Sequence, residues 1–375
     1  MNLEYSCFIK LTVERYLKGY EHGGNMIKIT AKFSRIKFLM ERSLLKNGLS
    51  GVYNMLLYGL TLKLNKDKIM GDPITINLEP TGKCNLRCTM CKRTYYDEQR
   101  IQDLTFDRYL KIIGQFKYLN NIIFTGLGEG IMNKDFFRIV DHAKNIKKVD
   151  YIFVISNGTL LNREVCEKFV NSGIDKVSIS FDGATKETYN SIRAGADYDK
   201  VLYNIKTLVD TKKRYGSNII IHLGFVLMKK NAHQMKEIVN LAHKLGVSTL
   251  SMGVVNPNFT GKSEMHQALA VHVDDTAVKE AEDLAKSYGL GFEFIRDVPK
   301  GVCGYPWQGP YITADGYIAT CCVNPDPRTF NFGNILETPY YELKNSQQVV
   351  SFRKDLASGG IPPNCKGCPL AGVHN

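Results

Sequence analysis

The sequence lacks any run of 18 or more apolar residues, although 44% of its residues are hydrophobic. It therefore offers no candidate for a membrane-spanning helix, which needs about 20 apolar residues in a row. The first ten residues, MNLEYSCFIK, also lack the apolar stretch and the small-residue cleavage site of a secretory signal. For these two reasons we expect a cytoplasmic protein, and its charged content of 23% is ordinary for a soluble globular chain.

Acidic residues are scarce near the N-terminus. Between residues 28 and 68, nine Lys or Arg residues stand against two acidic residues, so this segment carries +7 of the net charge of +12. Such a charge favours anionic partners, namely phosphates, nucleic acid or an anionic membrane surface. Apolar residues interleave with the basic ones at helical spacing. We predict a basic helical N-terminal extension over residues 1–72, which either contacts an anionic membrane peripherally or forms a solvated face of helices packed on the main domain.

Ten cysteines are present, and most of them are clustered. Disulfides are rare in a reduced cytosol, so clustered cysteines in such a protein indicate metal binding. Cys7 and Cys166 stand apart from the clusters, and Cys166 lies on a predicted helix. We expect neither of these two to bind metal, since free cysteines are commonly buried as small apolar residues.

From residue 74 onward, strand-like and helix-like segments alternate. β-Branched runs occupy residues 74–79, 121–126, 151–156, 176–181, 218–227 and 247–254, and helix-period stretches occupy 105–118, 134–146, 162–172, 198–214 and 232–245. Six strand–helix repeats indicate an α/β fold with a parallel sheet and helices outside it. We predict a partial (β/α)6 TIM-like barrel over residues 73–295, with its site at the carboxyl ends of the strands. Residues 296–375 are rich in Gly, Pro, Asn and Cys, and we predict a small cysteine-rich C-terminal domain there.

The first cysteine group follows the first predicted strand. Cys84, Cys88 and Cys91 have the spacing C-x3-C-x2-C. Three thiolates on one loop can hold three irons of a cubane cluster, which leaves the fourth iron open to a cofactor. The alternative is a zinc site, but such sites usually have four ligands, and no fourth ligand lies nearby in the sequence.

This loop, CNLRCTMC, resembles the defining motif of the radical S-adenosylmethionine superfamily, and the resemblance extends over about residues 74–375. It implies a 4Fe–4S cluster whose open iron is chelated by S-adenosylmethionine. It further implies reductive cleavage of that cofactor to a 5′-deoxyadenosyl radical, which abstracts hydrogen from a substrate. An electron donor such as ferredoxin or flavodoxin would supply the electron. The protein's task would be to position cofactor and substrate.

Two glycine-containing segments resemble further motifs of the superfamily. Thr125–Gly130 is similar to a Gly-Gly-Glu-Pro motif, which implies that Gly128 and Glu129 bind the methionine amino group of the cofactor. This segment departs from the motif because Leu127 separates the glycines and Gly130 replaces the proline. The segment Ser-Asn-Gly-Thr at 156–159 is similar to Thr-Asn-Gly-Thr, which implies that Asn157 lies near the cofactor. The alternative for both segments is a plain turn.

Three polar residues complete the expected cofactor site. Ser180 and Asp182 end the fourth predicted strand, and their spacing allows both side chains to point into one site. The resemblance implies that they contact the ribose and carboxylate of S-adenosylmethionine. It also implies that Arg193 pairs with that carboxylate, a task that suits a guanidinium group. The alternative for Arg193 is a surface ion pair.

The second cysteine group has the pattern C-x12-G-x4-C followed by C-x2-C. It resembles the opening of the SPASM/Twitch extension, which implies an auxiliary 4Fe–4S cluster. An Asp315-Gly316 turn would form a hairpin that brings the first two cysteines together. The alternative is a structural zinc site of the ribbon type. The expected auxiliary ligands are Cys303, Cys321, Cys365 and Cys368.

Cys322 is left over beside Cys321. It could replace Cys321 as a ligand, pack as a small apolar residue, or donate a hydrogen atom to a substrate radical. No other catalytic residue is predicted. We expect a radical enzyme that oxidises, epimerises or otherwise modifies an unidentified peptide, lipid or sugar. The competing hypothesis is a non-catalytic iron–sulfur or zinc protein that binds nucleic acid through its basic face.

Overall fold

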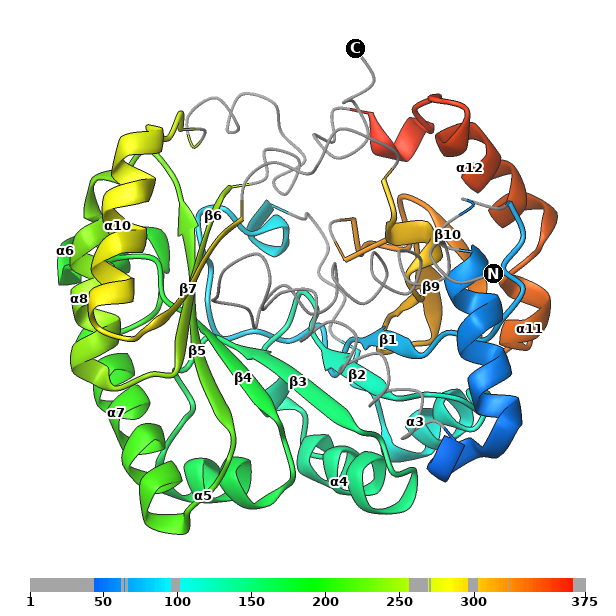
Figure 1. The fold of residues 1–375 in the computed structure, drawn as a ribbon, viewed down its shortest axis with the longest axis horizontal. Helices are drawn as coiled ribbons and strands as arrows, with labels where there is room; N and C mark the ends of the chain where they lie inside the picture. The colour runs from blue at the N-terminus through cyan, green and yellow to red at the C-terminus, as the bar shows by residue number, and fades with distance from the viewer. Residues whose placement is uncertain are drawn as a thin grey trace, which may run out of the picture.

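The computed structural model describes residues 44–61, 64, 67–95, 102–255, 269, 271–295, 303–322 and 324–366. The predictions about Cys7, Cys368 and most of the N-terminal extension lie outside these residues. Within them, the strands form one mixed sheet in the order β10-β9-β8-β1-β2-β3-β4-β5-β6-β7. Figure 1 shows this sheet curled into an incomplete ring.

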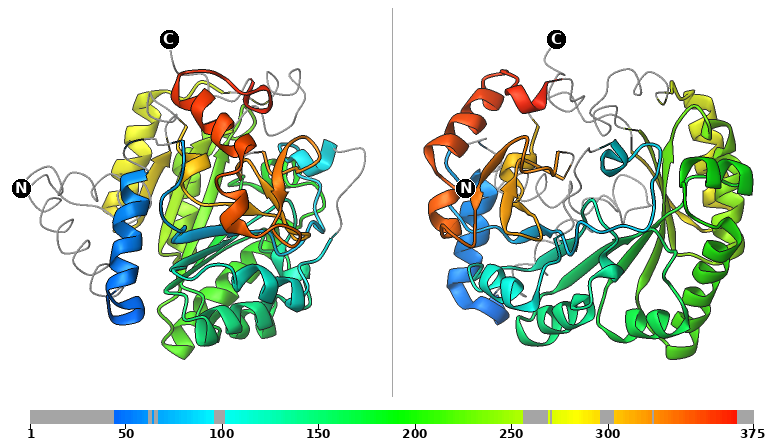
Figure 2. Two further views of the ribbon diagram at one scale, coloured as in Figure 1. Left: turned by 90° about the vertical axis from the view of Figure 1, so that its right-hand side faces the viewer. Right: turned by 180° about the vertical axis from the view of Figure 1, so that it is seen from behind.

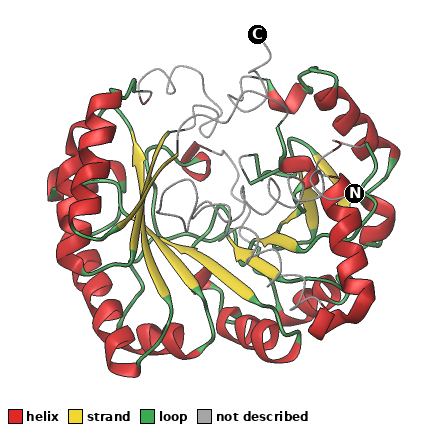
Figure 3. Cartoon of the chain, in the orientation of Figure 1, coloured by secondary structure: helices red, strands yellow, loops and turns green. Residues whose placement is uncertain are grey.

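Parallel strands form most of the ring. The six predicted strands are present as β1 (Thr75–Leu78), β2 (Asn121–Phe124), β3 (Tyr151–Ser156), β4 (Lys176–Ser180), β5 (Ile220–Leu227) and β6 (Thr249–Val254). A seventh parallel strand, β7 (Gly291–Ile295), pairs with β6. Figure 3 shows the strands inside and the helices outside. The predicted α/β fold with a partial barrel is confirmed.

The helices cover the outer surface of the sheet. They are α3 (Phe106–Ile113), α4 (Phe136–Asp141) continued by a π-helix (His142–Ile146), α5 (Arg163–Asn171), α6 (Lys186–Ile192), α7 (Tyr198–Tyr215), α8 (Met235–Leu245) and α10 (Asp275–Ser287). Local chemistry sets their ends: Thr105 and Asn162 accept hydrogen bonds from the first turns of α3 and α5. Gly246 ends α8 with a φ of 76°, a conformation that glycine adopts without steric cost.

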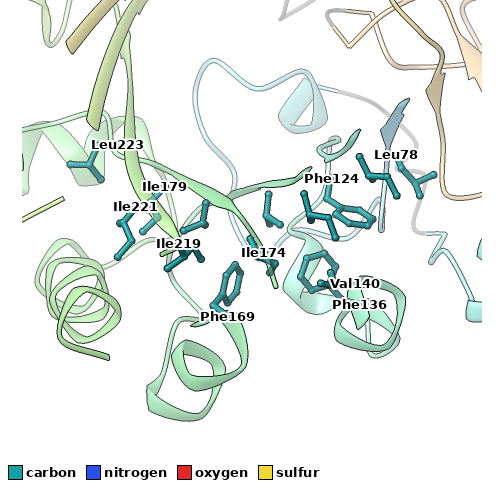
Figure 4. Packing of buried hydrophobic residues seen from close by; sticks show 14 of the residues in the cluster. Leu78, Phe124, Phe136, Val140, Phe169, Ile174, Ile179, Ile219, Ile221 and Leu223 are labelled. Atoms are coloured by element: carbon teal, nitrogen blue, oxygen red, sulfur yellow. The ribbon is translucent and has the colours of Figure 1, made fainter. Parts of the chain in front are cut away.

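The core lies between the sheet and these helices. Figure 4 shows side chains of the strands packed against the helices, with Leu78, Phe124 and Ile179 facing Phe136 and Phe169. All five are at most 1% exposed. Burying a side chain of this size contributes about 1.5–3 kcal/mol. The core therefore fixes the strands whose carboxyl ends carry the site.

The C-terminal segment continues the barrel sheet. A turn at Asp315-Gly316 joins β8 (Tyr311–Ile312) and β9 (Tyr317–Ala319) as an antiparallel hairpin, as predicted. Gly316 has a φ of 92°, which favours glycine. Strand β8 also pairs in parallel with β1, and β9 pairs with β10 (Asn331–Asn334). Helices α11 (Tyr340–Leu343) and α12 (Gln347–Ala357) follow.

Residues 44–61 are helical, with a break at Gly48, whose φ of 63° is left-handed; this segment precedes β1 and packs beside the C-terminal segment. The Tyr58 hydroxyl donates to the Trp307 carbonyl at 2.8 Å. In the side view of Figure 2, this blue helix and the cyan 3-10 helix Lys92–Tyr95 (η2) lie at opposite edges of the molecule. Within the described residues, no helix combines the length and the apolarity needed to span a bilayer.

Candidate active site

The loop with the first three cysteines leaves the carboxyl end of β1 and is held by backbone hydrogen bonds. The Arg87 amide donates to the Ala194 carbonyl and the Thr89 amide to the Ile192 carbonyl, both at 2.9 Å. The buried Arg93 side chain donates from Nε to the Gly82 carbonyl at 3.0 Å. These contacts fix the loop against the segment after α6.

Two side-chain donors lie beside the cysteine sulfurs. Arg193 Nη1 lies 3.8 Å from Cys88 Sγ, and Asn157 Nδ2 lies 3.8 Å from Cys84 Sγ. Hydrogen bonds to ligand sulfurs stabilise the negative charge of an iron–sulfur cluster and tune its reduction potential. The structure thus brings together two predicted cofactor residues and two predicted ligands.

Burial affects the thiols of this loop. It raises the pKa of Cys88 to about 11, although the nearby Arg193 guanidinium opposes the shift. Burial also raises the pKa of Cys91. The thiolate is the form that binds metal, so cluster binding would release protons from these groups. Among the described side chains, no three His, Cys, Asp or Glu converge as the ligands of a single metal ion do. A cubane cluster is larger than one ion, so its cysteine ligands lie further apart.

The segment after β2 wraps closely around the cysteine loop. Glu129 is 2% exposed, and its amide donates to the Lys83 carbonyl at 2.7 Å. Its carboxylate accepts from Ser156 Oγ at 2.9 Å and from the Asn157 amide at 2.6 Å. Burial raises the pKa of Glu129, and these hydrogen bonds oppose the rise. A carboxylate has room for about four hydrogen bonds, so Glu129 keeps acceptor capacity for an amino group.

Gly128 stands where no side chain fits. A Cβ atom there would lie 2.0 Å from the Thr81 carbonyl oxygen and 2.5 Å from the Lys83 carbonyl oxygen. Both are backbone atoms of the loop that leads to Cys84, so they cannot move without moving the loop.

We therefore expect Gly128→Ala to lower 5′-deoxyadenosine release from S-adenosylmethionine by at least about tenfold and to reduce the iron content. Gly130→Ala is the matched control, because its Cβ would meet only the Pro80 and Phe136 side chains, at 3.3 Å or more. Iron analysis and product chromatography measure both effects. Equal values for the two variants would contradict the argument.

Asp182 and Arg193 form a buried ion pair. Arg193 Nη2 lies 2.5 Å from Asp182 Oδ2, and the two side chains are 8% and 0% exposed. Asp182 Oδ1 accepts from the Val226 amide at 2.7 Å. Burial by itself lowers the pKa of Arg193, but Asp182 and Cys88 outweigh it, so the pKa rises. The pair is therefore not the surface ion pair that was the alternative for Arg193.

One donor of this pair stays available. Arg193 Nε is buried and has no hydrogen-bond partner among the described residues. An unpaired buried donor is costly unless a ligand satisfies it. A cofactor carboxylate would do so, which fits the predicted role of Arg193. Asp182 accepts a hydrogen bond from the Val226 amide at Oδ1 and forms an ion pair with Arg193 at Oδ2, so its position suits orienting Arg193.

Ser180 begins a polar row on the inward side of the barrel that sequence reasoning missed. The register aligns Ser180 with Gly224, Gly224 with Ser251, and Ser251 with Glu293. Ser180 is half-buried, and its hydroxyl makes no hydrogen bond within the described part of the chain. Side chains along a strand point alternately to its two faces, and this alternation was the signal that could have revealed the row.

His222, on β5, forms a hydrogen bond with Ser251 of this row. Its Nδ1 lies 2.7 Å from Thr249 Oγ1 and its Nε2 lies 2.8 Å from Ser251 Oγ. Burial, with a smaller effect of Lys176, lowers the pKa of His222 from 6.5 to about 3. The neutral ring donates through one nitrogen and accepts through the other, which fixes both hydroxyls.

The lowered pKa predicts acid sensitivity. Between the unfolded value of 6.5 and the folded value of about 3, the unfolded chain binds the extra proton, so stability falls as the pH falls. The loss of unfolding free energy approaches about 1.4 kcal/mol per pH unit. His222→Gln should flatten the fall in the thermal unfolding midpoint between about pH 7 and pH 5. His243→Gln, at an exposed histidine of α8, is the control; the same flattening there would contradict the assignment.

The second cysteine group lies near η2. The Asn324 amide donates to Cys321 Sγ at 3.3 Å, and Lys92 Nζ donates to Asn324 Oδ1 at 2.8 Å. The latter contact ties the end of the first cysteine loop to the second group.

The leftover Cys322 lies near the other members of this group. Burial is the largest cause that raises its pKa to about 12, followed by Cys321. Tyr305 donates a hydrogen bond to it and opposes the rise. Cys303 and Cys365 are half-buried, whereas Cys368 lies outside the described residues. The remaining cysteine, Cys166, is buried in the core, as expected.

Comparison with known families and proteins adds independent information. The model of the radical SAM superfamily matches residues 78–242, and the model of an iron-sulfur cluster-binding domain, SPASM, matches residues 303–369. The chain is 26% identical over 317 residues to a tungsten-containing aldehyde ferredoxin oxidoreductase cofactor-modifying protein of Pyrococcus furiosus, covering 78% of this chain and 86% of that protein. It is 23% identical to a probable GTP 3′,8-cyclase of Methanocaldococcus jannaschii, covering 70% and 89%.

Solved structures share the fold. SuiB of Streptococcus suis matches with a TM-score of 0.63 at 14% identity, covering 100% of this chain and 88% of that chain. The protein anSMEcpe with bound AdoMet matches with a TM-score of 0.57 at 18% identity, covering 80% and 85%. At such low identity these likenesses concern the fold alone.

The two family models cover both cysteine groups and the strand ends between them. The cofactors of the chain are accordingly 4Fe–4S clusters and S-adenosylmethionine, and its activity is enzymatic. The chain belongs to the radical SAM superfamily and carries a SPASM-type iron–sulfur domain at its C-terminal end.

Proposed function

We propose that this enzyme cleaves S-adenosylmethionine reductively at a cluster held by Cys84, Cys88 and Cys91 and then abstracts hydrogen from a polar substrate. One observation carries the proposal: Asn157 and Arg193 place N–H donors beside two of the three sulfurs. Such donors suit the sulfurs of an anionic cluster.

The chain's own residues would bind and orient the cofactor. When bound, cluster and cofactor supply radical chemistry that amino-acid side chains lack. Glu129 would accept hydrogen bonds from the methionine amino group, and Gly128 lets this segment lie directly against the backbone of the cysteine loop at Thr81 and Lys83. Arg193 would donate from Nε to the cofactor carboxylate, with Asp182 holding the guanidinium in place. Ser180 would donate to the ribose.

The substrate would lie against the inward row of β4 to β7. Beyond Ser180, which is assigned to the ribose, its hydrogen-bonding groups are the hydroxyl of Ser251 and the carboxylate of Glu293. These groups recognise hydroxyl, amide or ammonium groups better than apolar ones. A substrate rich in such groups, such as a peptide or a sugar, fits this row. The activities named for the relatives differ from one another, so they favour no single substrate.

The C-terminal domain would hold an auxiliary cluster. Its four ligands would be Cys303, Cys321, Cys365 and Cys368, which leaves no iron open for substrate. We propose that it accepts the electron of an oxidised substrate or relays electrons from a donor such as ferredoxin or flavodoxin. Cys322 would act as a hydrogen donor only if Cys321 is the ligand.

Anaerobic reconstitution tests the proposal. The purified chain with iron, sulfide, S-adenosylmethionine and a strong reductant should release 5′-deoxyadenosine, measured by chromatography. Iron and sulfide analysis should show two cubanes. Release of no nucleoside by a fully loaded protein would favour a non-catalytic iron–sulfur protein instead.

We further propose that the basic N-terminal segment associates peripherally with an anionic membrane surface. The support is the charge of +7 between residues 28 and 68.

A further inference from the structure

The helix at residues 44–61 buries polar groups and exposes its leucines. Asn54 Nδ2 donates to the Asp72 carbonyl at 3.0 Å, and the Asp72 amide donates back to Asn54 Oδ1 at 2.7 Å. The Tyr58 hydroxyl donates to the Trp307 carbonyl at 2.8 Å. These contacts fix the rotation of the helix about its axis. The leucines cannot turn inward without breaking them.

The outward side of this segment is apolar, and we call it the leucine face. It consists of Leu49, Tyr53, Leu56 and Leu60, which recur every three or four residues after Gly48, together with the exposed Leu45 just before Gly48. Leu45, Leu49 and Tyr53 are 86%, 80% and 64% exposed. A contiguous exposed apolar face of this kind marks a site of interaction with another body.

In the sequence, basic residues precede and follow the segment that carries the leucine face. Lys46 is the one charged residue of the sequence between residues 44 and 61. Its ammonium group donates to the Leu119 carbonyl at 3.0 Å and lies 3.8 Å from Asp150. Basic residues flank the helix in the sequence, at Lys37 and Arg42 before it and at Lys63, Lys66 and Lys68 after it. Along the sequence, an apolar stretch with one charged residue therefore lies between two predominantly basic stretches.

We propose that the leucine face docks on an anionic phospholipid membrane. The leucines and Tyr53 would enter the boundary between headgroups and acyl chains, about 5–10 Å deep. The flanking basic residues would contact the anionic headgroups. This inference deepens the peripheral association proposed above by assigning the residues that insert.

A second copy of the chain suits this face less well. Pairing two leucine faces would bring two segments of charge +7 together, and like charges at an interface repel. An anionic bilayer satisfies both the apolar face and its basic flanks. In Figure 2 the helix lies at the edge opposite η2, which follows the cysteine loop. Docking would therefore localise the enzyme while its site stays on the side away from the bilayer.

Vesicle co-sedimentation of the full-length, cluster-loaded protein tests the proposal. The probes are vesicles of phosphatidylcholine alone and of equal parts phosphatidylcholine and phosphatidylglycerol. The wild type should bind the anionic vesicles, and added salt should weaken binding. The double variant Leu45→Ser with Leu49→Ser should bind on the order of tenfold more weakly, because it inserts less apolar surface. The control double variant, Ile146→Ser with Tyr203→Ser, removes side chains that are 68% and 72% exposed elsewhere and should bind like the wild type.

Three outcomes would overturn the proposal. Equal binding to both kinds of vesicle would remove the role of anionic lipid. Unchanged binding of the leucine variant would leave charge alone as the cause. A wild-type dimer that the leucine variant converts to monomer, without vesicle binding, would make a second copy the occupant. Iron content and 5′-deoxyadenosine release are measured for every variant, so that failure of the radical chemistry is distinguished from failure of docking.

Discussion

Replacing Cys88 with alanine is expected to abolish 5′-deoxyadenosine release from S-adenosylmethionine. A cubane held by two cysteines instead of three loses a ligand to iron. Changes in residues that merely support metal ligands typically cost 10- to 100-fold, so loss of a ligand should exceed about a hundredfold. Cys84→Ala and Cys91→Ala should behave alike. Chromatography of the nucleoside products and iron analysis measure the effect.

The control for this experiment is Cys166→Ala. Cys166 lies in the core, with its sulfur 3.5 Å from the Leu161 carbonyl. Its replacement removes a thiol without touching either cysteine group, so iron content and nucleoside release should stay at the wild-type level. Each single variant of the first group should still retain the iron of the auxiliary cluster. Nucleoside release that survives the loss of all three first-group cysteines would refute their role.

Local signals made the cysteine loop predictable from sequence. Cys84, Cys88 and Cys91 lie within eight residues of one another, and the resemblance of this loop to the superfamily motif implies their chemistry. The strands were predictable for a related reason, because a buried parallel strand reads as a short apolar run. Strand β7 was missed because Glu293 interrupts such a run within five residues.

Contacts between distant segments could not be predicted in this way. The parallel pairing of Asn77 with Tyr311 joins the C-terminal segment to the first strand of the barrel, and no local pattern encodes it. The ion pair of Asp182 with Arg193 was likewise not predictable from the sequence. The sequence motifs assigned both residues to the cofactor and not to each other.

The orientation of the N-terminal helix was also beyond sequence reasoning. Helical spacing predicts an amphipathic helix, whose leucines would ordinarily face the core. Here the side chain of Asn54 finds backbone partners in the protein and turns the leucines outward. A pattern of apolar residues identifies a face, but partners elsewhere in the chain decide which way it points.

The buried pair of Asp182 and Arg193 leads to the second large prediction. Asp182→Asn removes the carboxylate and leaves the guanidinium buried without a counter-charge, at a site where the two groups lie 2.5 Å apart. Breaking a buried pair on one side costs about 3–5 kcal/mol. We expect the thermal unfolding midpoint of the anaerobic protein to fall by roughly 5 °C. Circular dichroism measures it.

An exposed pair of nearly the same length provides the control. Lys186 Nζ lies 2.6 Å from Asp199 Oδ2, and the two side chains are 55% and 64% exposed. Water screens such a pair, so Asp199→Asn should leave the midpoint almost unchanged. Asp182→Asn should also weaken cofactor binding, because Arg193 loses the group that orients it. The variant Asp182→Glu keeps a carboxylate and should recover part of the lost stability. Equal unfolding midpoints for Asp182→Asn and Asp199→Asn would show that burial does not strengthen the pair.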